Sequence, residues 1–136
     1  PLVESRGTRY TGRILGSNGV NPATKPYIQI YDLEVSNPAK WLAAFAKLIE
    51  DTKVSANGGM VVYGTYDVGA PMGVNRDGTA THWVALGADN LGELIMAKVE
   101  GEKYVDEWTE YHQTKGETKI LNHYSLRILK DYGSFN

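Results

Sequence analysis

One histidine in the middle of a predicted strand is the residue best suited to chemistry. The stretch "TATHWVALGADN", residues 79–90, has the pattern of a β-strand that runs into a helix cap, and it places His82 beside Trp83. An imidazole titrates near neutral pH, so His82 can take a proton from an activated carbon or a phenol. A partly buried position lowers the pKa of a histidine and keeps it neutral, as a general base requires. The alternative is a structural histidine, hydrogen-bonded to a neighbouring tyrosine.

Tyrosines on two other predicted strands can supply the hydroxyl group that such a base needs as a partner. "YIQIYDLEV", residues 27–35, alternates with a period of two, which is typical of a strand with two different faces. We expect its aliphatic residues, Ile28 and Ile30, to lie beneath helices. The opposite, helix-free face then carries the remaining side chains of the alternation, namely Tyr27, Gln29 and Tyr31.

The same reasoning applies to "MVVYGTYDV", residues 60–68. Val62 is expected beneath the helices, and Tyr63 and Thr65 on the helix-free face. For the strand that holds His82, both assignments stay open, because a shift of one residue exchanges the faces. One set contains His82, Val84 and Leu86, and the other contains Thr81, Trp83 and Ala85.

The last predicted strand, "TKILNHYSLRILKD" at 118–131, carries a second polar cluster. His123 shares a face with Leu121, Ser125 and Arg127, whereas Asn122 and Tyr124 lie on the opposite face. Only one set can reach a cavity. The sequence therefore predicts His82, Tyr63 and Tyr31 as catalytic candidates, and as ligand-binding candidates Tyr27, Gln29, Thr65, Trp83, Asn122 and Tyr124.

Other kinds of site have little support in the sequence. The three histidines lack the close spacing of metal ligands, and we expect no metal site. His112 lies near a predicted helix end, where a cation is favourable for ordinary reasons. Asp32 and Asp67 are mid-strand acids that can orient a histidine or pair with Arg127. No phosphate-binding loop or serine elbow is present, and no cofactor is expected.

Composition restricts the class of protein. At 136 residues with a net charge of −2, the chain has the size of one domain and no basic surface for nucleic acid. No apolar run is long enough to span a bilayer, and no basic segment favours a membrane surface. The lack of cysteine excludes disulfides and thiol nucleophiles. We expect a soluble chain, with the cytoplasm favoured, and the sequence leaves open whether a leader was removed from Pro1.

The remaining segments position these candidates. Residues 1–26 are rich in turn-forming residues and are expected to form an N-terminal extension containing one short strand in "RYTGRIL". Its arginines, Arg6, Arg9 and Arg13, fit a solvated arm better than an anion site. The loop "GAPMGVNRDGT" is long for a hairpin and is expected to form a flap.

Two helices are predicted. The first follows Ser36 or Asn37 as cap and Pro38 in the first turn, with an apolar stripe of Trp41, Leu42, Phe45, Leu48 and Ile49. The second begins after Asp89 or Asn90 and is expected to break or kink at Gly101. Its predicted apolar stripe consists of Leu91, Leu94, Ile95, Val99, Val105 and Trp108.

The order of elements in residues 27–136 is therefore β-α-β-β-α-β. This order is the ferredoxin-like arrangement, an α+β fold in which both helices cover one face of a four-stranded antiparallel sheet. The other face would carry several tyrosines, and a monomer that exposed them would tend to associate. Pairing with a second copy also removes free strand edges. We therefore expect a homodimer.

With its element order and the segment "THWVAL", the chain resembles the dimeric α/β-barrel superfamily over residues 27–130. This superfamily includes stress-responsive barrel proteins, plant polyketide cyclases of the olivetolic acid type, antibiotic-biosynthesis monooxygenases and haem-degrading relatives. A Thr-His pair followed by alternating aliphatics is frequent in the third strand of the stress-responsive and cyclase members. The resemblance implies that His82 is a cavity-lining general base with Tyr63 or Tyr31 as its hydroxyl partner.

Two functions remain open at this point. The first is a dimeric domain that binds a small hydrophobic or aromatic molecule in an aromatic-lined barrel cavity. The second is a cofactor-independent cyclase- or monooxygenase-like enzyme that acts on a small aromatic or polyketide-like substrate with His82 as base. A tyrosine-rich cavity needs no catalyst to explain it, so the first is preferred.

Overall fold

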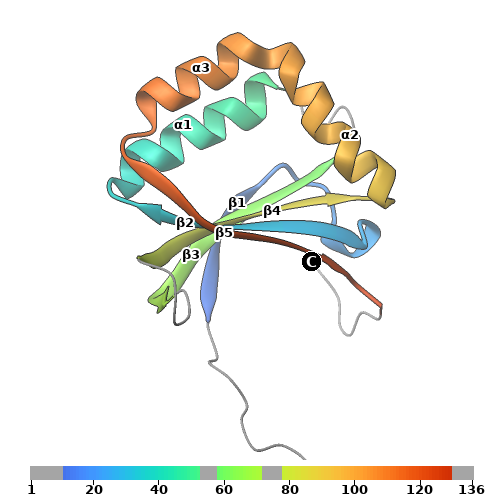
Figure 1. Cartoon of the computed structure of the whole chain (residues 1–136), viewed down its shortest axis with the longest axis horizontal. Coiled ribbons are helices and arrows are strands. Elements are labelled where there is room, and N and C mark those ends of the chain that lie inside the picture. Colours follow the sequence, from blue (N-terminus) through green and yellow to red (C-terminus); the bar gives the residue numbers. More distant parts are fainter. Residues whose placement is uncertain (1–10, 53–57, 72–77, 130–136) are drawn as a thin grey trace, which may run out of the picture.

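The chain folds into one antiparallel sheet with helices packed on one side, as seen in a computed structural model that describes residues 11–52, 58–71 and 78–129. The strands are β1 (Gly12–Ser17), β2 (Tyr27–Val35), β3 (Met60–Pro71), β4 (Thr79–Ala88) and β5 (Thr118–Arg127). The helices are α1 (Pro38–Asp51), α2 (Leu91–Gly101) and α3 (Val105–Thr114), with short 3-10 turns η1 (Pro22–Thr24) and η3 (Glu102–Tyr104). Figure 1 shows α1 and α3 side by side above the sheet, with α2 descending toward it.

The expected α+β class is confirmed, but the sheet has five strands where four were predicted. Its order is β1-β3-β4-β2-β5, and every neighbouring pair is antiparallel. β2 and β4 lie at the centre, as expected. β3 does not form an edge, because β1 pairs with it from Gly12 opposite Tyr66 to Ser17 opposite Val62. The short strand predicted in the N-terminal segment is thus part of the sheet.

Both helix starts follow the predicted cap chemistry. The Asn37 side chain accepts a hydrogen bond from the Lys40 N–H at 3.1 Å, and Pro38 opens α1. The Asn90 side chain accepts from the Glu93 N–H at 2.9 Å at the start of α2. The predicted second helix is interrupted after Gly101, where η3 separates α2 from α3.

The core beneath the helices is built from aromatic rings. Trp41 of α1 is fully buried and stacks on Phe45 with 5.2 Å between ring centroids. Tyr63 of β3 meets Phe45 edge to face at 5.0 Å, and the Trp41 indole N–H donates to the Tyr111 hydroxyl at 3.2 Å. Leu33, Val61 and Val84 complete this cluster from the sheet. Such edge-to-face packing fills the core while the hydroxyl groups of tyrosine reach partners.

The predicted faces of β2 and β3 are wrong, because each is exchanged. Tyr31 and Tyr63 pack against the core beneath the helices, whereas Ile30 and Val62 lie on the opposite face. We expected aliphatic side chains of β2 and β3 to pack beneath the helices. The large rings of α1 and α3 pack against tyrosines of these strands instead.

Ile28 and Val62 are buried on the opposite face by a small second core. Together with Met60 and Ala85 they form a cluster against which Val20, from the segment between β1 and β2, packs. Asn18 holds this segment to the start of β3 by donating to the Gly59 carbonyl at 2.7 Å and accepting from the Val61 N–H at 3.1 Å. The N-terminal segment therefore covers one part of the face that has no helix.

The predicted apolar stripe of the second helical region is mostly exposed. Only Leu94 of α2 is buried, while Leu91, Ile95, Val99, Val105 and Trp108 are exposed. α2 therefore packs toward the sheet with only a small part of its surface, which includes Leu94. No helix in the described ranges is long and apolar enough to cross a membrane.

Candidate functional site

His82 lies beneath helix α1, on the covered face of the sheet. Its side chain is 3% exposed, and its ring meets that of Trp41 with 4.9 Å between centroids. His82 Nδ1 lies 2.8 Å from Thr81 Oγ1, which also accepts from the Val35 N–H at 3.0 Å. Burial lowers the pKa of His82 below its ordinary value. The imidazole is therefore neutral near pH 7, and Trp41 packs against it.

The other two catalytic candidates, Tyr63 and Tyr31, lie on the same face as His82, beneath the helices, and not on the helix-free face where they were expected. Tyr63 is buried and packs on Phe45 and Trp41. Tyr31 is partly buried at the edge of the same core, and its ring lies 6.0 Å from that of His123. Burial raises the pKa of the Tyr31 hydroxyl.

The predicted ligand-binding residues divide between the two faces. Thr65 lies directly opposite His82 on the covered face. Gln29 is buried on that face, and the Tyr27 ring lies 5.4 Å from the Arg127 guanidinium carbon. Trp83, Asn122 and Tyr124 lie on the helix-free face, because they stand opposite Asp32 or Ile30 of β2.

The three helix-free candidates lie on the two strands that flank a buried carboxylate of β2. Asp32 is 4% exposed, and its Cα partners on the neighbouring strands are Trp83 of β4 and Asn122 of β5. The Tyr66 hydroxyl, from β3, donates to Asp32 Oδ1 at 2.5 Å. Four strands thus bring polar and aromatic side chains to one place, which we call the Asp32 cluster: Asp32, Tyr66, Trp83, Asn122 and Tyr124.

Two glycines make room for the indole of Trp83. A Cβ added to Gly64 would lie 2.6 Å from Trp83 Cζ2, and one added to Gly12 would lie 3.1 Å from Nε1. The indole N–H donates to the Thr65 carbonyl at 3.3 Å. Since a side chain at either glycine would displace the ring, Gly12 and Gly64 fix Trp83 across β3 toward β1.

The pairing of the sheet is irregular on both sides of the Asp32 cluster. Between β2 and β5 the register shifts after Asp32, where Leu121 is the extra residue of β5. Between β3 and β4 the register shifts after Thr65, next to Tyr66. Bulges of this kind redirect side chains and are frequent beside functional sites.

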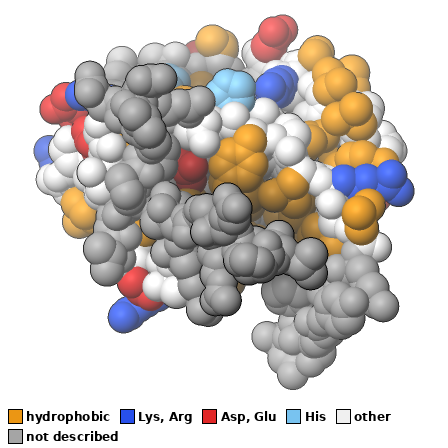
Figure 2. Space-filling model, turned by 60° about the horizontal axis from the view of Figure 1, so that its bottom comes forward, with side chains coloured by type: hydrophobic (Ala, Val, Ile, Leu, Met, Phe, Trp, Pro, Cys, Tyr) orange, Lys and Arg blue, Asp and Glu red, His pale blue; other side chains and the backbone are white. Residues whose placement is uncertain are grey.

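Electrostatics also connect the members of the cluster. Burial raises the pKa of the Tyr124 hydroxyl, and the nearby negative charge of Asp32 raises it further. Tyr124 is 41% exposed and Leu126, on the same face, is 38% exposed. Figure 2 views this side of the molecule, where hydrophobic side chains reach the surface.

The mid-strand acids have other partners than the sequence predicted. Asp32 pairs with neither a histidine nor Arg127. Asp67 forms an ion pair with Arg13 of β1 at 2.9 Å. The partner of Asp32 was not predicted, because a strand pattern does not show that Tyr66 reaches this carboxylate across β4. The available signal was an acid in the middle of the strand "YIQIYDLEV", between Tyr31 and Leu33.

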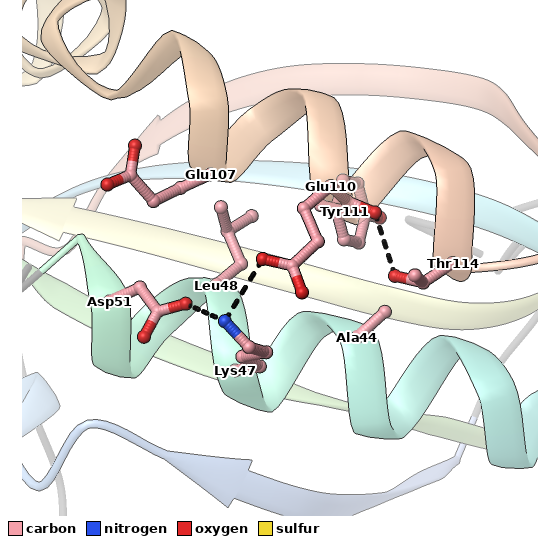
Figure 3. A pocket seen from close by; sticks show the side chains of 8 residues that line it. All are labelled: Ala44, Lys47, Leu48, Asp51, Glu107, Glu110, Tyr111 and Thr114. Atoms are coloured by element: carbon pink, nitrogen blue, oxygen red, sulfur yellow. Dashed lines mark hydrogen bonds and ion pairs between the residues drawn. The ribbon is translucent and has the colours of Figure 1, made fainter.

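A shallow hollow lies along the contact between helices α1 and α3. Figure 3 shows Lys47 at its centre, where the ammonium group bridges Asp51 and Glu110. Hydrogen bonds to these two carboxylates raise the pKa of Lys47. Lys47, Asp51 and Glu110 therefore hold the two helices together at the surface, and Glu107 lines the same hollow.

A metal has no evident place in the described part of the chain. No group of three or more histidine, cysteine, aspartate or glutamate side chains converges there. No protein-family model, curated protein or solved structure matches this chain. The candidate site therefore depends on its own geometry: a buried carboxylate with a phenol donor, and two further aromatic residues, Trp83 and Tyr124, on the flanking strands.

Proposed function

We propose that the chain is a homodimeric, small-molecule-binding domain of the ferredoxin-like, dimeric α/β-barrel type. The order β3-β4-β2-β5 agrees with the split βαβ arrangement once β1 is treated as an added edge strand. Helices on one face only leave the opposite face for a second copy (Figure 1). In this proposal the helix-free faces of two copies meet and enclose the Asp32 cluster.

One observation carries the proposal. The helix-free face combines exposed apolar groups, Tyr124 and Leu126, with the buried polar centre at Asp32. A surface that serves only solubility is not expected to gather aromatic side chains around a carboxylate. β5, hydrogen-bonded to β2 on one side, supplies a strand edge that a second chain can meet.

Light scattering at micromolar concentration tests this association. The expected mass is twice the 15.0 kDa of one chain. Tyr124→Glu places a charge on the helix-free face and is expected to yield the single-chain mass, because an unpaired charge is costly to bury at an interface. Ile95→Glu, on the exposed side of α2, is the matched control and should keep the double mass. A wild-type chain of single mass contradicts the proposal, and so does a dimer that only Ile95→Glu dissociates.

The second candidate is a cyclase- or monooxygenase-like enzyme with His82 as general base. Its supporting observation is the lowered pKa, which keeps the imidazole in the form that a base needs. Trp41 packs against the ring, however, so a substrate would have to displace a fully buried indole. This packing places the enzyme second. A His82→Gln chain that lost a detected activity while keeping its fold would favour it.

A further inference from the structure

We propose that α2 and the start of α3 form a docking surface for a basic amphipathic helix of a partner protein. The surface consists of exposed apolar side chains and is called the α2 surface below: Leu91, Ile95, Met96, Val99, Val105 and Trp108. It is separate from the proposed dimer contact, which uses the helix-free face of the sheet. Three features support it: the composition of α2, the path of the exposed side chains, and the charges beside them.

Helix α2 has more apolar side chains than the fold buries. Its sequence "LGELIMAKVEG" contains five large aliphatic residues, but only Leu94 is buried. Leu91, Ile95 and Val99 are four residues apart, so they lie along one side of the helix, and each is about half exposed. Helices that are apolar on several sides are normally covered on several sides. In Figure 1, α3 lies beside α1, whereas α2 descends toward the sheet without a helix beside it.

The exposed apolar side chains continue from α2 into α3. The Trp108 indole nitrogen lies 3.7 Å from the position that a Cβ on Gly101 would take. The first turns of α3 therefore lie against the end of α2. Trp108 is 38% exposed, and Val105, one turn earlier, is 64% exposed. A surface that gathers this many large apolar groups is typical of a site for another protein.

The charged groups beside the α2 surface are mostly acidic. Residues 91–108 contain two lysines, Lys98 and Lys103, and a larger set of acids: Glu93, Glu100, Glu102, Asp106 and Glu107. Lys103 is already paired with Glu100 at 2.7 Å. Glu102 and Asp106 are exposed and form no ion pair within the described ranges. A helix with apolar residues on one side and lysine or arginine on the other complements such a surface.

Two other occupants agree less well with these charges. A second copy that bound through the same surface would bring two acidic segments together, because a twofold contact joins identical patches. A bilayer with anionic lipids would repel the acids, and helices that bind membrane surfaces usually carry lysine and arginine on their polar side. A basic partner helix provides both the apolar contact and the opposite charge.

Fluorescence anisotropy with a labelled peptide tests the α2 surface in the full chain. The probe is a synthetic peptide of about 18 residues, long enough to be helical when bound, with leucine on one side of the helix and lysine on the other. We expect a Kd of about 10 μM or tighter. The same peptide with glutamate in place of lysine should bind about tenfold more weakly or worse, because its charge repels the acids.

Two variants separate the apolar contact from the charge. Ile95→Glu should weaken binding of the lysine peptide by about tenfold or more, because it places a charge inside the contact. Ile120→Glu is the matched control, since it makes the same change at an isoleucine of β5 with similar exposure, 62% against 57%, and it should bind like the wild type. The double variant Glu102→Gln with Asp106→Gln keeps the apolar groups and should weaken binding by about threefold.

The proposal is supported if only Ile95→Glu loses the lysine peptide and the glutamate peptide binds poorly. It is overturned if the lysine peptide does not bind, if both peptides bind equally, or if the two isoleucine variants behave alike. Binding to phosphatidylcholine vesicles that Ile95→Glu abolishes would identify a lipid surface and would also overturn it. A mass that falls from double to single in Ile95→Glu would assign the α2 surface to a second copy, whereas a single mass in the wild type contradicts the dimer alone.

Discussion

His82 is buried on the covered face of the sheet and Asp32 on the helix-free face, and the surroundings of the two side chains differ. His82, on the covered face, is neutral and enclosed by Trp41 and Thr81. Asp32, on the helix-free face, accepts from the Tyr66 hydroxyl and lies near Tyr124, which is 41% exposed. Burial by itself therefore does not identify a functional group. The useful criterion is whether the packed chain leaves a charge or a hydrogen bond that a ligand can satisfy.

The largest expected effect on stability comes from removing a large side chain from the core beneath the helices. Trp41→Ala removes a fully buried indole that contacts Phe45, Tyr63 and His82. We expect a loss of about 3–5 kcal/mol in the free energy of unfolding. Denaturant unfolding measures it. Trp108→Ala, the same change at a partly exposed indole, should cost clearly less, and equal losses would mean that the covered face is not the main core.

A smaller effect is expected where β3 passes under the indole of Trp83. In Gly64→Ala the new methyl group would meet the Arg13 carbonyl and Trp83. We expect a loss of about 1–3 kcal/mol from overpacking, together with altered tryptophan fluorescence. The control is Gly101→Ala, where the nearest atom is at an ordinary 3.7 Å and a helical alanine is expected to stabilise by about 0.5–1 kcal/mol. The same sign in both variants would contradict this packing.

The pH dependence of stability distinguishes the buried imidazole from the exposed ones. Burial lowers the pKa of His82 in the folded chain below its ordinary value of 6.5. As the pH falls through 6.5, the unfolded chain therefore binds a proton that the folded chain does not. Stability is then lost with falling pH until the pH reaches the folded pKa.

His82→Gln should flatten this part of the curve of unfolding free energy against pH. His112→Gln, at an exposed position, is the control and should keep the slope of the wild type. If the slope is the same in His82→Gln as in the wild type, the assigned burial of His82 is wrong.

The smallest effect is expected on the exposed side of α2. Ile95→Ala should change the free energy of unfolding by about 0.5 kcal/mol or less, because the side chain is 57% exposed. Leu94→Ala, one residue earlier but buried, should cost about 2–5 kcal/mol. Thermal or denaturant unfolding of the pair checks the orientation of α2, and comparable losses would mean that this helix packs by a different face.

The sequence was informative where local chemistry decides the structure. Asn37 and Asn90 cap their helices, Gly101 ends α2, and the alternation in residues 27–35 indicates a strand. The sequence was misleading about which face of the sheet each side chain of β2 occupies. Ile28 and Ile30 are apolar enough to pack in the core beneath the helices or in the small core on the helix-free face. Their choice depends on Trp41 and Phe45 on one side and Val20 on the other. These contacts are long-range and leave no period in the sequence.

The candidate site was predictable only in part for the same reason. Trp83, Asn122 and Tyr124 were predicted as ligand-binding residues together with Tyr27, Gln29 and Thr65, but the structure divides the two groups between the faces of the sheet. Tyr66 reaches Asp32 from two strands away, beside an irregular register that no local pattern reports. A short motif can indicate that a residue type suits a reaction, but the packing decides whether that residue is accessible.

Thiol labelling tests most directly whether the helix-free face is the face that associates. The chain has no cysteine, so Leu126→Cys on that face and Ile95→Cys on α2 each introduce a single thiol at an exposed apolar position. We expect a maleimide to label Leu126→Cys more slowly than Ile95→Cys at micromolar concentration, with the difference vanishing on dilution as the dimer dissociates. Equal, concentration-independent rates at the two positions would contradict the account.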